Sequence, residues 1–255
     1  MHPLEEWKLP TKHVGRQVLV FAQMDSTNSY AAGLGNDPAN SGIVVIAHEQ
    51  SAGRGQHGRT WQCPSGMGVL MSVLLFPPPA VRRPVILAAL AANAACETIR
   101  RTTDLQARIK WPNDVLLRGR KVCGILIEQT GPTVMGIGLN VLQPESVFEN
   151  AGLPVAASLE MFAGKSLNRD EIARQLIQEL DEQYGQIVDG NLDKLESAWK
   201  WRMGLLGKQV EVECVDQLVH GRLDDLSFDR IAINPIGGFP LLILPERIKH
   251  ITEQV

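Results

Sequence analysis

The segment from Gln50 to Trp61 carries the residues best suited to binding an anion. It holds three glycines and two arginines in the seven positions from Gly53 to Arg59. Glycine lets a backbone approach a ligand closely and point successive N–H groups at it, and arginine adds a permanently charged planar group that fits carboxylate or phosphate. The alternative is a flexible basic surface turn, but the segment follows an apolar strand-like run and ends in a tryptophan. We therefore interpret it as an anion-binding active-site loop.

Two common nucleotide motifs do not describe this loop. The glycine spacing from Gly53 to Gly58 matches the dinucleotide fingerprint, which also needs a following helix and an acidic residue about 20 residues later. Here Cys63, a proline and a strand-like run follow, and Met71–Val81 contains no acid. A Walker A loop ends in Gly-Lys-Ser/Thr, whereas this loop has Gly58-Arg-Thr. The loop therefore binds its anion by a different geometry.

Three further segments carry residue types suited to a nucleotide or an acid. Lys110–Asp114 combines an amine, an amide and a carboxylate around a proline-fixed bend, and Lys121–Glu128 begins an apolar strand with a lysine. Gly136–Asn140 alternates glycines, which clears one face of a strand for a ligand or a neighbouring backbone. Each has a plain structural explanation when taken alone, such as a strand-end turn or a solvated strand end. Their joint occurrence, in this order, indicates one composite site.

A sheet covered by helices must position these segments. Runs of β-branched and apolar residues predict strands at 16–22, 42–48, 68–76, 115–117, 122–128 and 133–142. Helical periodicity and capping residues predict helices at 25–35, 83–101, 168–184 and 191–203. After residue 207 the chain changes to short alternating segments with Gly and Pro turns, which indicates a small β module that docks on the main domain.

Together with Asp25–Asn28 (Asp-Ser-Thr-Asn), these motifs resemble those of biotin–protein ligases, from about Arg16 to Met203. The resemblance implies an α+β fold: a mixed β-sheet with flanking helices, like the catalytic domain of class II aminoacyl-tRNA synthetases, followed by an SH3-like β module. The expected domains are a biotin ligase catalytic domain at 1–205 and the SH3-like domain at 206–255.

The same resemblance implies an ATP-dependent biotin–[acetyl-CoA-carboxylase] ligase. Such an enzyme makes biotinyl-5'-AMP from biotin and Mg-ATP and releases pyrophosphate. It then transfers biotin to a lysine of the biotin carboxyl carrier domain of acetyl-CoA carboxylase or a related carboxylase. A homodimer is left open.

Each motif residue receives a role from this resemblance. The catalytic residues are Lys121, which holds the biotin carboxylate and then the adenylate phosphate, Arg54, and Asp114, which helps the acceptor lysine to lose its proton. The biotin-binding residues are expected to be Ser26, Thr27, Asn28, Gln50, Gly53, Arg54, Gly55, Gln56, Lys121 and Gly124. The residues expected to bind ATP or the adenylate are Arg54, Arg59, Trp61, Lys110, Asn113 and Asn140. No protein metal site is expected, and the ligands of Mg²⁺ stay open.

The chain departs from the family pattern at two places. Many members have a further arginine in the glycine loop, where this chain has Gln56 and His57. With fewer fixed charges, we expect the adenylate to be retained less tightly. Some members also carry an N-terminal helix-turn-helix domain and act as repressors. Only about 15 residues precede the first predicted strand, so we expect no DNA-binding regulation.

Two other functions compete with this interpretation. A lipoate–protein ligase or octanoyltransferase has a similar fold, but the Gly-Arg loop together with Lys110–Asp114 favours biotin. A non-catalytic ligand-binding protein with the same pocket is expected to lack Lys121 or Arg54, and this chain has both.

Composition agrees with an ordinary globular protein. The chain has 255 residues, 44% of them hydrophobic and 21% charged, and a formal net charge of -3, which argues against a bulk positive field for nucleic acid. The four cysteines form no Cys-x-x-Cys pair, so reduced thiols are expected. The N-terminus lacks the charged and apolar regions of a signal peptide, and no apolar run is long enough to span a bilayer. We expect a cytoplasmic protein with no membrane partner.

Overall fold

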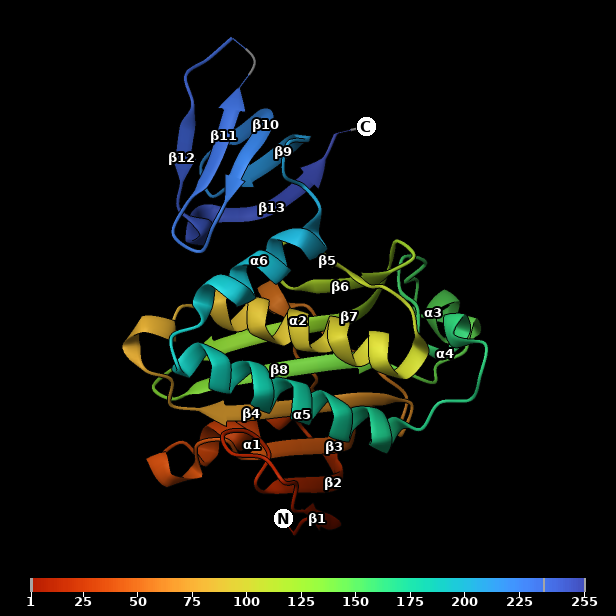
Figure 1. The fold of residues 1–255 in the computed structure, drawn as a ribbon. Coiled ribbons are helices and arrows are strands. Elements are labelled where there is room, and N and C mark those ends of the chain that lie inside the picture. Colours follow the sequence, from red (N-terminus) through yellow and green to blue (C-terminus); the bar gives the residue numbers. More distant parts are fainter. Residues whose placement is uncertain (1, 236, 255) are drawn as a thin grey trace.

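The computed structural model describes residues 2–235 and 237–254, which form two sheets and a layer of helices (Figure 1). The larger sheet has eight strands in the order β1-β2-β3-β4-β8-β7-β6-β5. Its strands are β1 (Glu5–Trp7), β2 (Val18–Met24), β3 (Val44–Gln50), β4 (Gly68–Leu75), β5 (Arg108–Lys110), β6 (Asp114–Leu117), β7 (Arg120–Gln129) and β8 (Thr133–Asn140). β2 and β3 pair in parallel and the other neighbours are antiparallel, so the sheet is mixed.

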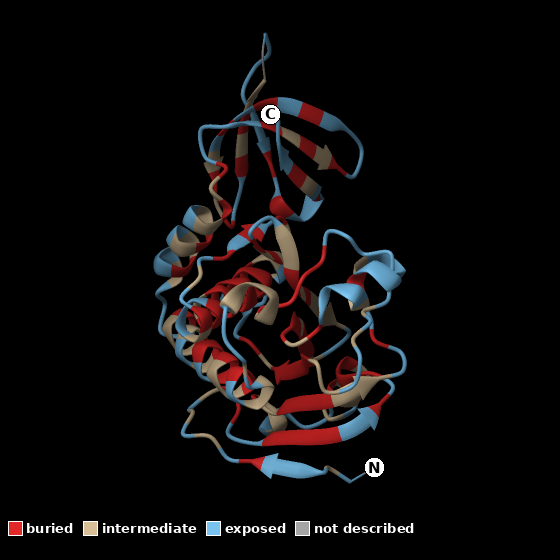
Figure 2. Ribbon diagram, turned by 90° about the vertical axis from the view of Figure 1, so that its right-hand side faces the viewer, coloured by how far each residue is buried: buried red, intermediate tan, exposed pale blue. Residues whose placement is uncertain are grey.

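Side chains alternate between the two faces of this sheet. Val18 and Val20 of β2 face the main apolar core, while Leu19 and Phe21 face a smaller core on the other side. In the middle strands, residues that point to either face are buried, because both faces of the sheet are covered. Figure 2 shows the buried residues concentrated in the middle strands, with β1 largely exposed near the N-terminus.

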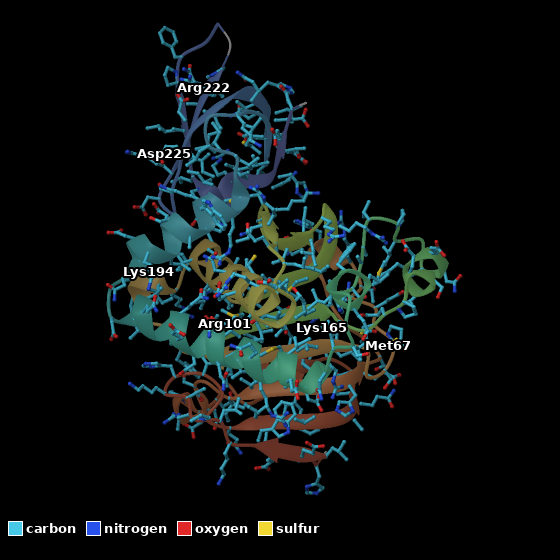
Figure 3. The ribbon with its side chains drawn as sticks, turned by 45° about the vertical axis from the view of Figure 1, so that its right-hand side comes forward. Met67, Arg101, Lys165, Lys194, Arg222 and Asp225 are labelled. Atoms are coloured by element: carbon cyan, nitrogen blue, oxygen red, sulfur yellow. The ribbon has the colours of Figure 1, made fainter. Side chains whose placement is uncertain are left out.

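Helices cover the face that carries the main core. Alanine-rich α2 (Pro84–Thr103) packs against the sheet and against α5 (Arg169–Val188), and α6 (Leu192–Met203) lies beside them (Figure 1). Small alanine side chains allow this close approach of helix to sheet and helix to helix. Asn168 caps α5 by accepting hydrogen bonds from the backbone N–H groups of Asp170 and Glu171. The side chains of Arg101 and Lys194 lie along this helical layer (Figure 3).

The remaining helices are short. α1 (Thr27–Gly33) contacts β3, β4 and β8, and its residue Ala31 belongs to the smaller core. α3 (Glu145–Asn150) and α4 (Glu160–Ala163) follow β8. No described helix is long and apolar enough to cross a membrane.

The C-terminal segment forms a second, five-stranded antiparallel sheet in the order β12-β11-β10-β9-β13. Its strands are β9 (Gln209–Cys214), β10 (Leu218–Leu226), β11 (Ile231–Pro235), β12 (Leu241–Ile243) and β13 (Ile248–Glu253). Trp199 of α6 contacts Phe228 with ring centroids 5.1 Å apart, and Trp111 Nε1 donates a hydrogen bond of 3.1 Å to the Ile248 carbonyl. Aromatic packing and one buried hydrogen bond therefore join this sheet to the rest of the chain.

The predicted α+β fold with a mixed sheet and flanking helices is confirmed. One expectation about the N-terminus was wrong: β1 precedes the first predicted strand and pairs with β2 at the sheet edge. Three residues are too few to show a strand period, so this strand left no readable pattern. β5, which contains Lys110, was missed for the same reason.

Candidate active site

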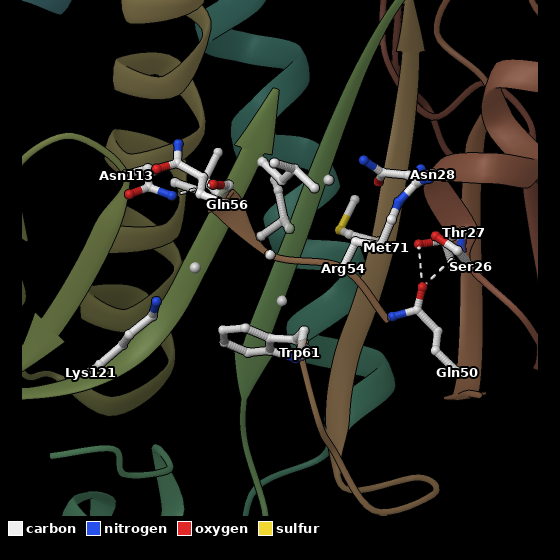
Figure 4. Close-up of a pocket in the computed structure, with 17 residues that line it drawn as sticks. Ser26, Thr27, Asn28, Gln50, Arg54, Gln56, Trp61, Met71, Asn113 and Lys121 are labelled. Carbon is white, nitrogen blue, oxygen red and sulfur yellow. Dashed lines mark hydrogen bonds between the residues drawn. The ribbon is translucent and has the colours of Figure 1, made fainter. Parts of the chain in front are cut away.

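The sequence-predicted motifs meet at one pocket on the larger sheet (Figure 4). Its floor is formed by β7 and β8, and its walls by the start of α1 and the loop between β3 and β4. The lining residues are Ser26, Thr27, Asn28, Gln50, Arg54, Gly55, Gln56, Trp61, Met71, Asn113, Lys121, Gly124, Ile125, Leu126, Gly136, Ile137 and Gly138. Segments up to 112 positions apart therefore contribute to one cavity.

The loop between β3 and β4 folds back on itself as a small hairpin. The backbone N–H of Trp61 donates to the Gly53 carbonyl at 3.0 Å, and that of Gly55 donates to the Arg59 carbonyl at 2.7 Å. A short 3₁₀ turn at Gln56–Gly58 closes the hairpin. His57 has a φ of 55°, the left-handed region that costs a non-glycine residue some strain. We refer to residues 53–61 as the hairpin loop.

The glycines of β7 and β8 make room for side chains of the site. A Cβ at Gly138 would lie 2.4 Å from Trp61 Cε2, and one at Gly124 would lie 2.7 Å from Trp61 Cζ3. A Cβ at Gly136 would lie 2.3 Å from Asn28 Oδ1. The cleared strand face predicted for Gly136–Asn140 is therefore used, but by Trp61 and Asn28 of the same chain.

One end of the pocket is lined by polar side chains that hold one another. Gln50 Oε1 accepts hydrogen bonds from the backbone N–H of Thr27 at 2.8 Å and from its hydroxyl at 3.1 Å. The hydroxyl of Ser72, on β4, lies 2.7 Å from Thr27 Oγ1 and donates to Asn28 Oδ1 at 2.5 Å. Ser72 was not predicted from the sequence; a polar residue inside an otherwise apolar strand was the available signal.

Glu128 joins this polar end to the hairpin loop. Its Oε2 accepts from Asn28 Nδ2 at 2.7 Å and from Arg54 Nη2 at 2.9 Å. Glu128 stands near the end of β7, outside the residues that line the pocket. No role for this carboxylate was predicted, although Glu128 belongs to the Lys121–Glu128 motif.

The other end of the pocket carries Lys121. Its Nζ lies 2.5 Å from Asp114 Oδ1 and 5.5 Å from the centroid of the Trp61 ring. Its backbone N–H donates to the Val155 carbonyl at 2.7 Å, and its carbonyl accepts from Ala157 N–H at 2.9 Å. The side chain of Lys121 is 32% exposed and that of Asp114 is 23% exposed, so solvent and ligands can reach both. Lys121 therefore has a fixed backbone and an accessible amine.

Most of the predicted site residues line this pocket, but some lie beside it. The predicted residues outside the lining are Gly53, Arg59, Lys110, Asp114 and Asn140. Arg59 and Lys110 are exposed, and Asp114 reaches the site through Lys121.

Asn140 is a buried structural amide in this conformation. It is 4% exposed, and its Nδ2 donates to the Ala157 carbonyl at 3.1 Å. Its Oδ1 accepts from Gln143 Nε2 at 3.0 Å. Asn113, in contrast, lines the pocket while its Nδ2 donates to the Ile125 carbonyl at 2.6 Å. The nucleotide roles of both amides stay predictions.

The cysteines supply no nucleophile near the pocket. Burial raises the pKa of the Cys63 thiol to about 11 and that of Cys96 to about 12, so both are protonated at neutral pH. Cys123 is fully buried, and burial raises its pKa as well. Within residues 2–235 and 237–254, no three His, Cys, Asp or Glu side chains gather in a way that could hold a metal ion.

Comparison with known proteins places these features in a family. Residues 20–141 match the model of the biotin/lipoate A/B protein ligase family. The biotin–[acetyl-CoA-carboxylase] ligase of Mycobacterium tuberculosis is 34% identical, over 98% of this chain and 96% of that protein. The bifunctional ligase/repressor BirA of Bacillus subtilis is 29% identical, over 84% of this chain and 68% of that protein.

A solved structure agrees in fold. The biotin protein ligase from Aquifex aeolicus, determined in complex with biotin and ATP, superposes with a TM-score of 0.79 at 24% identity, covering 93% of this chain and 99% of that one. At this identity the likeness concerns the fold alone. The sequence relatives and the shared architecture agree, and the chain therefore belongs to the biotin protein ligase family.

Proposed function

We propose that this chain activates biotin with ATP and transfers it to a lysine of a carrier domain. The single observation that supports the proposal is the difference in chemistry between the two ends of the pocket. Uncharged hydrogen-bonding side chains, Thr27 and Gln50 among them, lie at one end, and the amine of Lys121 lies at the other, with Trp61 between them (Figure 4). Biotin has this arrangement too, with a neutral ureido ring at one end and a carboxylate at the end of an apolar chain.

The first step joins the biotin carboxylate to the α-phosphorus of ATP. A carboxylate oxygen forms the new O–P bond, the bond from the α-phosphorus to the bridging oxygen breaks, and pyrophosphate leaves. Both partners are anions, so positive groups that are already in place lower the barrier most. Lys121 is the cation we assign to the carboxylate and then to the adenylate phosphate, with Trp61 and Asn113 on the nucleotide side. Arg54 is assigned with Ser26, Thr27 and Gln50 to the ureido end.

The second step forms an amide. The neutral amine of the acceptor lysine attacks the acyl carbon of biotinyl-5'-AMP, and AMP leaves with the electron pair of the broken C–O bond. The amine must first lose a proton, and Asp114 is the base we assign, since it lies within 2.5 Å of Lys121 at the accessible end. The proposed partner is the biotin carboxyl carrier domain of acetyl-CoA carboxylase or a related carboxylase.

Magnesium enters this proposal only as the counter-ion of ATP. The carboxylates of Asp114 and Glu128 are each paired with a cation, Lys121 and Arg54 respectively, and we assign neither of them to a metal ion. No step above depends on a protein-bound metal ion. The proposal also includes no DNA-binding repressor activity, in keeping with the formal net charge of -3.

ATP–pyrophosphate exchange tests the proposal directly. We expect the purified chain to exchange labelled pyrophosphate into ATP when biotin is present and not when lipoate or octanoate replaces it. A single-turnover reaction with a carrier domain should then yield one biotin per acceptor lysine. Exchange that depends on lipoate would point to the related lipoate chemistry, and tight biotin binding without exchange would point to a non-catalytic binding protein.

A further inference from the structure

Glu128 contacts the active site without lining it. One of its oxygens, Oε2, accepts two hydrogen bonds from pocket residues: 2.7 Å from Asn28 Nδ2 and 2.9 Å from Arg54 Nη2. The Arg54 bond is also an ion pair, with side-chain exposures of 45% for Arg54 and 32% for Glu128. Charge-assisted bonds of this kind are about twice as strong as neutral ones. Glu128 therefore fixes the direction of two pocket side chains at once.

The polar contacts continue from Glu128 to the start of the same loop. Asn28 is held at both ends of its amide, because its Oδ1 accepts from Ser72. Ser72 is in hydrogen-bond distance of Thr27, which in turn binds Gln50. Gln50 ends β3 and Arg54 lies in the hairpin loop, so the network includes one residue before the start of the loop and one residue within it.

The chain just before the hairpin loop is held by its backbone: Ser51 N–H donates to the Met24 carbonyl and Ala52 N–H to the Asp25 carbonyl, both at 2.9 Å. The loop's own backbone hydrogen bonds, from Gly55 to Arg59 and from Trp61 to Gly53, are internal and hold its shape rather than its place. Trp61 packs against Gly124 and Gly138 at one root of the loop. Beyond the other root, the Arg54–Glu128 pair is the side-chain contact that joins the hairpin loop to β7. A long arginine side chain has many rotamers, and a fixed acceptor is what selects one of them.

We propose that Glu128 is a positioning residue, which aims the Arg54 guanidinium into the pocket and holds the hairpin loop against the sheet. The effect on ligand binding rests on the proposed function, because it takes biotin as the ligand. The effect on the loop does not, since it concerns the ligand-free protein.

Hydrogen exchange of the ligand-free protein tests the loop. In Glu128→Ala we expect the amides of Gly55 and Trp61 to exchange about tenfold faster, because the loop opens more often without the Arg54 contact. Glu128→Gln keeps an acceptor oxygen of the same size, so its exchange should lie within about threefold of the wild type. The thermal midpoints of both variants show whether the fold is intact.

Calorimetric titration with biotin, without ATP, tests whether Glu128 orients the Arg54 guanidinium for ligand binding. Glu128→Ala should weaken binding roughly tenfold, the effect of one charge-assisted hydrogen bond. If Glu128 acts through Arg54, the double variant Arg54→Ala/Glu128→Ala should lose much less affinity for biotin than the two single losses added together, and the remaining loss reflects Asn28. Glu128→Gln should recover most of the affinity.

Glu246→Ala is the matched control. Glu246 pairs with Arg83 at 2.7 Å with similar exposure but lies far from the pocket along the chain, in the C-terminal segment. It should leave biotin binding and loop exchange unchanged. Unchanged exchange and binding in Glu128→Ala, or losses that add to those of Arg54→Ala, would overturn the inference. A wild-type protein that does not bind biotin would instead refute the proposed function. The hydrogen-exchange measurement would still decide the role of Glu128 in the loop.

Discussion

Lys121 and Asp114 form an ion pair at the accessible end of the pocket. In the proposed reaction, an incoming carboxylate must therefore share Lys121 with Asp114 or displace Asp114. Such a shared cation can hold an anion without binding it irreversibly, since part of its charge is already compensated. In the proposed second step, the Asp114 carboxylate is free to accept a proton once Lys121 turns to the adenylate phosphate.

Replacement of Lys121 by alanine should abolish most adenylate formation. The variant removes the one pocket amine that we assign to the phosphate, and the loss of such a contact costs about 10²–10³ in rate. Biotin-dependent pyrophosphate exchange measures the loss, and circular dichroism verifies the fold. Asp114→Ala is the informative companion, because it should keep exchange yet slow transfer to the carrier. Normal exchange in Lys121→Ala would remove Lys121 from the mechanism.

The residues that line the pocket were largely predictable, and their contacts were not. Ser26, Thr27, Gln50 and Lys121 belong to motifs that are local in sequence, so their types and spacing are visible there. Ser72 and Glu128 form hydrogen bonds with Asn28 across sequence separations of 44 and 100 residues. No local sequence pattern predicts these hydrogen bonds, because they depend on the order of strands in the sheet. The same holds for Trp61, whose place is set by Gly124 and Gly138 on neighbouring strands.

At the scale of elements, α2 and α5 share an ion pair on the helical face between a buried carboxylate and an exposed arginine. Glu179 of α5 is 3% exposed; its Oε1 lies 2.9 Å from Arg101 Nε of α2 and accepts a hydrogen bond from Gln175. Burial raises the pKa of Glu179 in spite of Arg101, and the nearby charges of Glu97 and Glu182 raise it further. The folded protein therefore binds this proton more tightly than the unfolded chain does.

This raised pKa predicts a pH-dependent effect of Glu179→Gln. An acid whose pKa is raised on folding stabilises the fold below its unfolded pKa, and that stabilisation is lost as the pH rises through the folded value. Glutamine has no charge to lose, so the variant should gain stability relative to the wild type between pH 4 and pH 7. Urea unfolding at both pH values measures the difference. A relative stability that does not change, or that falls, with rising pH would contradict the prediction.

Long elements were predicted well and short ones were not. The predicted helices at 83–101 and 168–184 correspond to Pro84–Thr103 and Arg169–Val188, and the strand at 68–76 corresponds to Gly68–Leu75. Each spans several periods of its pattern, which makes the period readable. β1, β5 and α4, with three or four residues each, span at most about one period. Their structure comes from pairing or packing with neighbours, which a local pattern does not contain.

At the scale of the whole molecule, a tryptophan of the Lys110–Asp114 motif joins the two sheets. Trp111 is 3% exposed, donates its indole N–H to Ile248 of β13 and contacts Trp199 of α6 with ring centroids 5.7 Å apart. Asn113 of the same motif lines the pocket. The Lys110–Asp114 segment thus contacts both the pocket and the C-terminal sheet. A structural change at one of them can therefore alter the other through this segment.

Trp111→Phe should destabilise the protein by about 1–3 kcal/mol, because it leaves the buried Ile248 carbonyl without its donor. Trp201→Phe is the control, since Trp201 on α6 is 64% exposed and its replacement should change stability by no more than about 0.5 kcal/mol. Urea unfolding followed by circular dichroism measures both. Equal stabilities of the two variants would show that the hydrogen bond to Ile248 contributes nothing.

The position of Trp61 also gives the protein an optical signal of its own. The other tryptophans, Trp7, Trp111, Trp199 and Trp201, lie outside the pocket lining, and the first three are buried. Trp61 borders the cavity, and its indole N–H is buried without a partner in the described chain. We therefore expect a ligand that enters the pocket to change the emission of this indole, so occupancy can be followed in real time without any label.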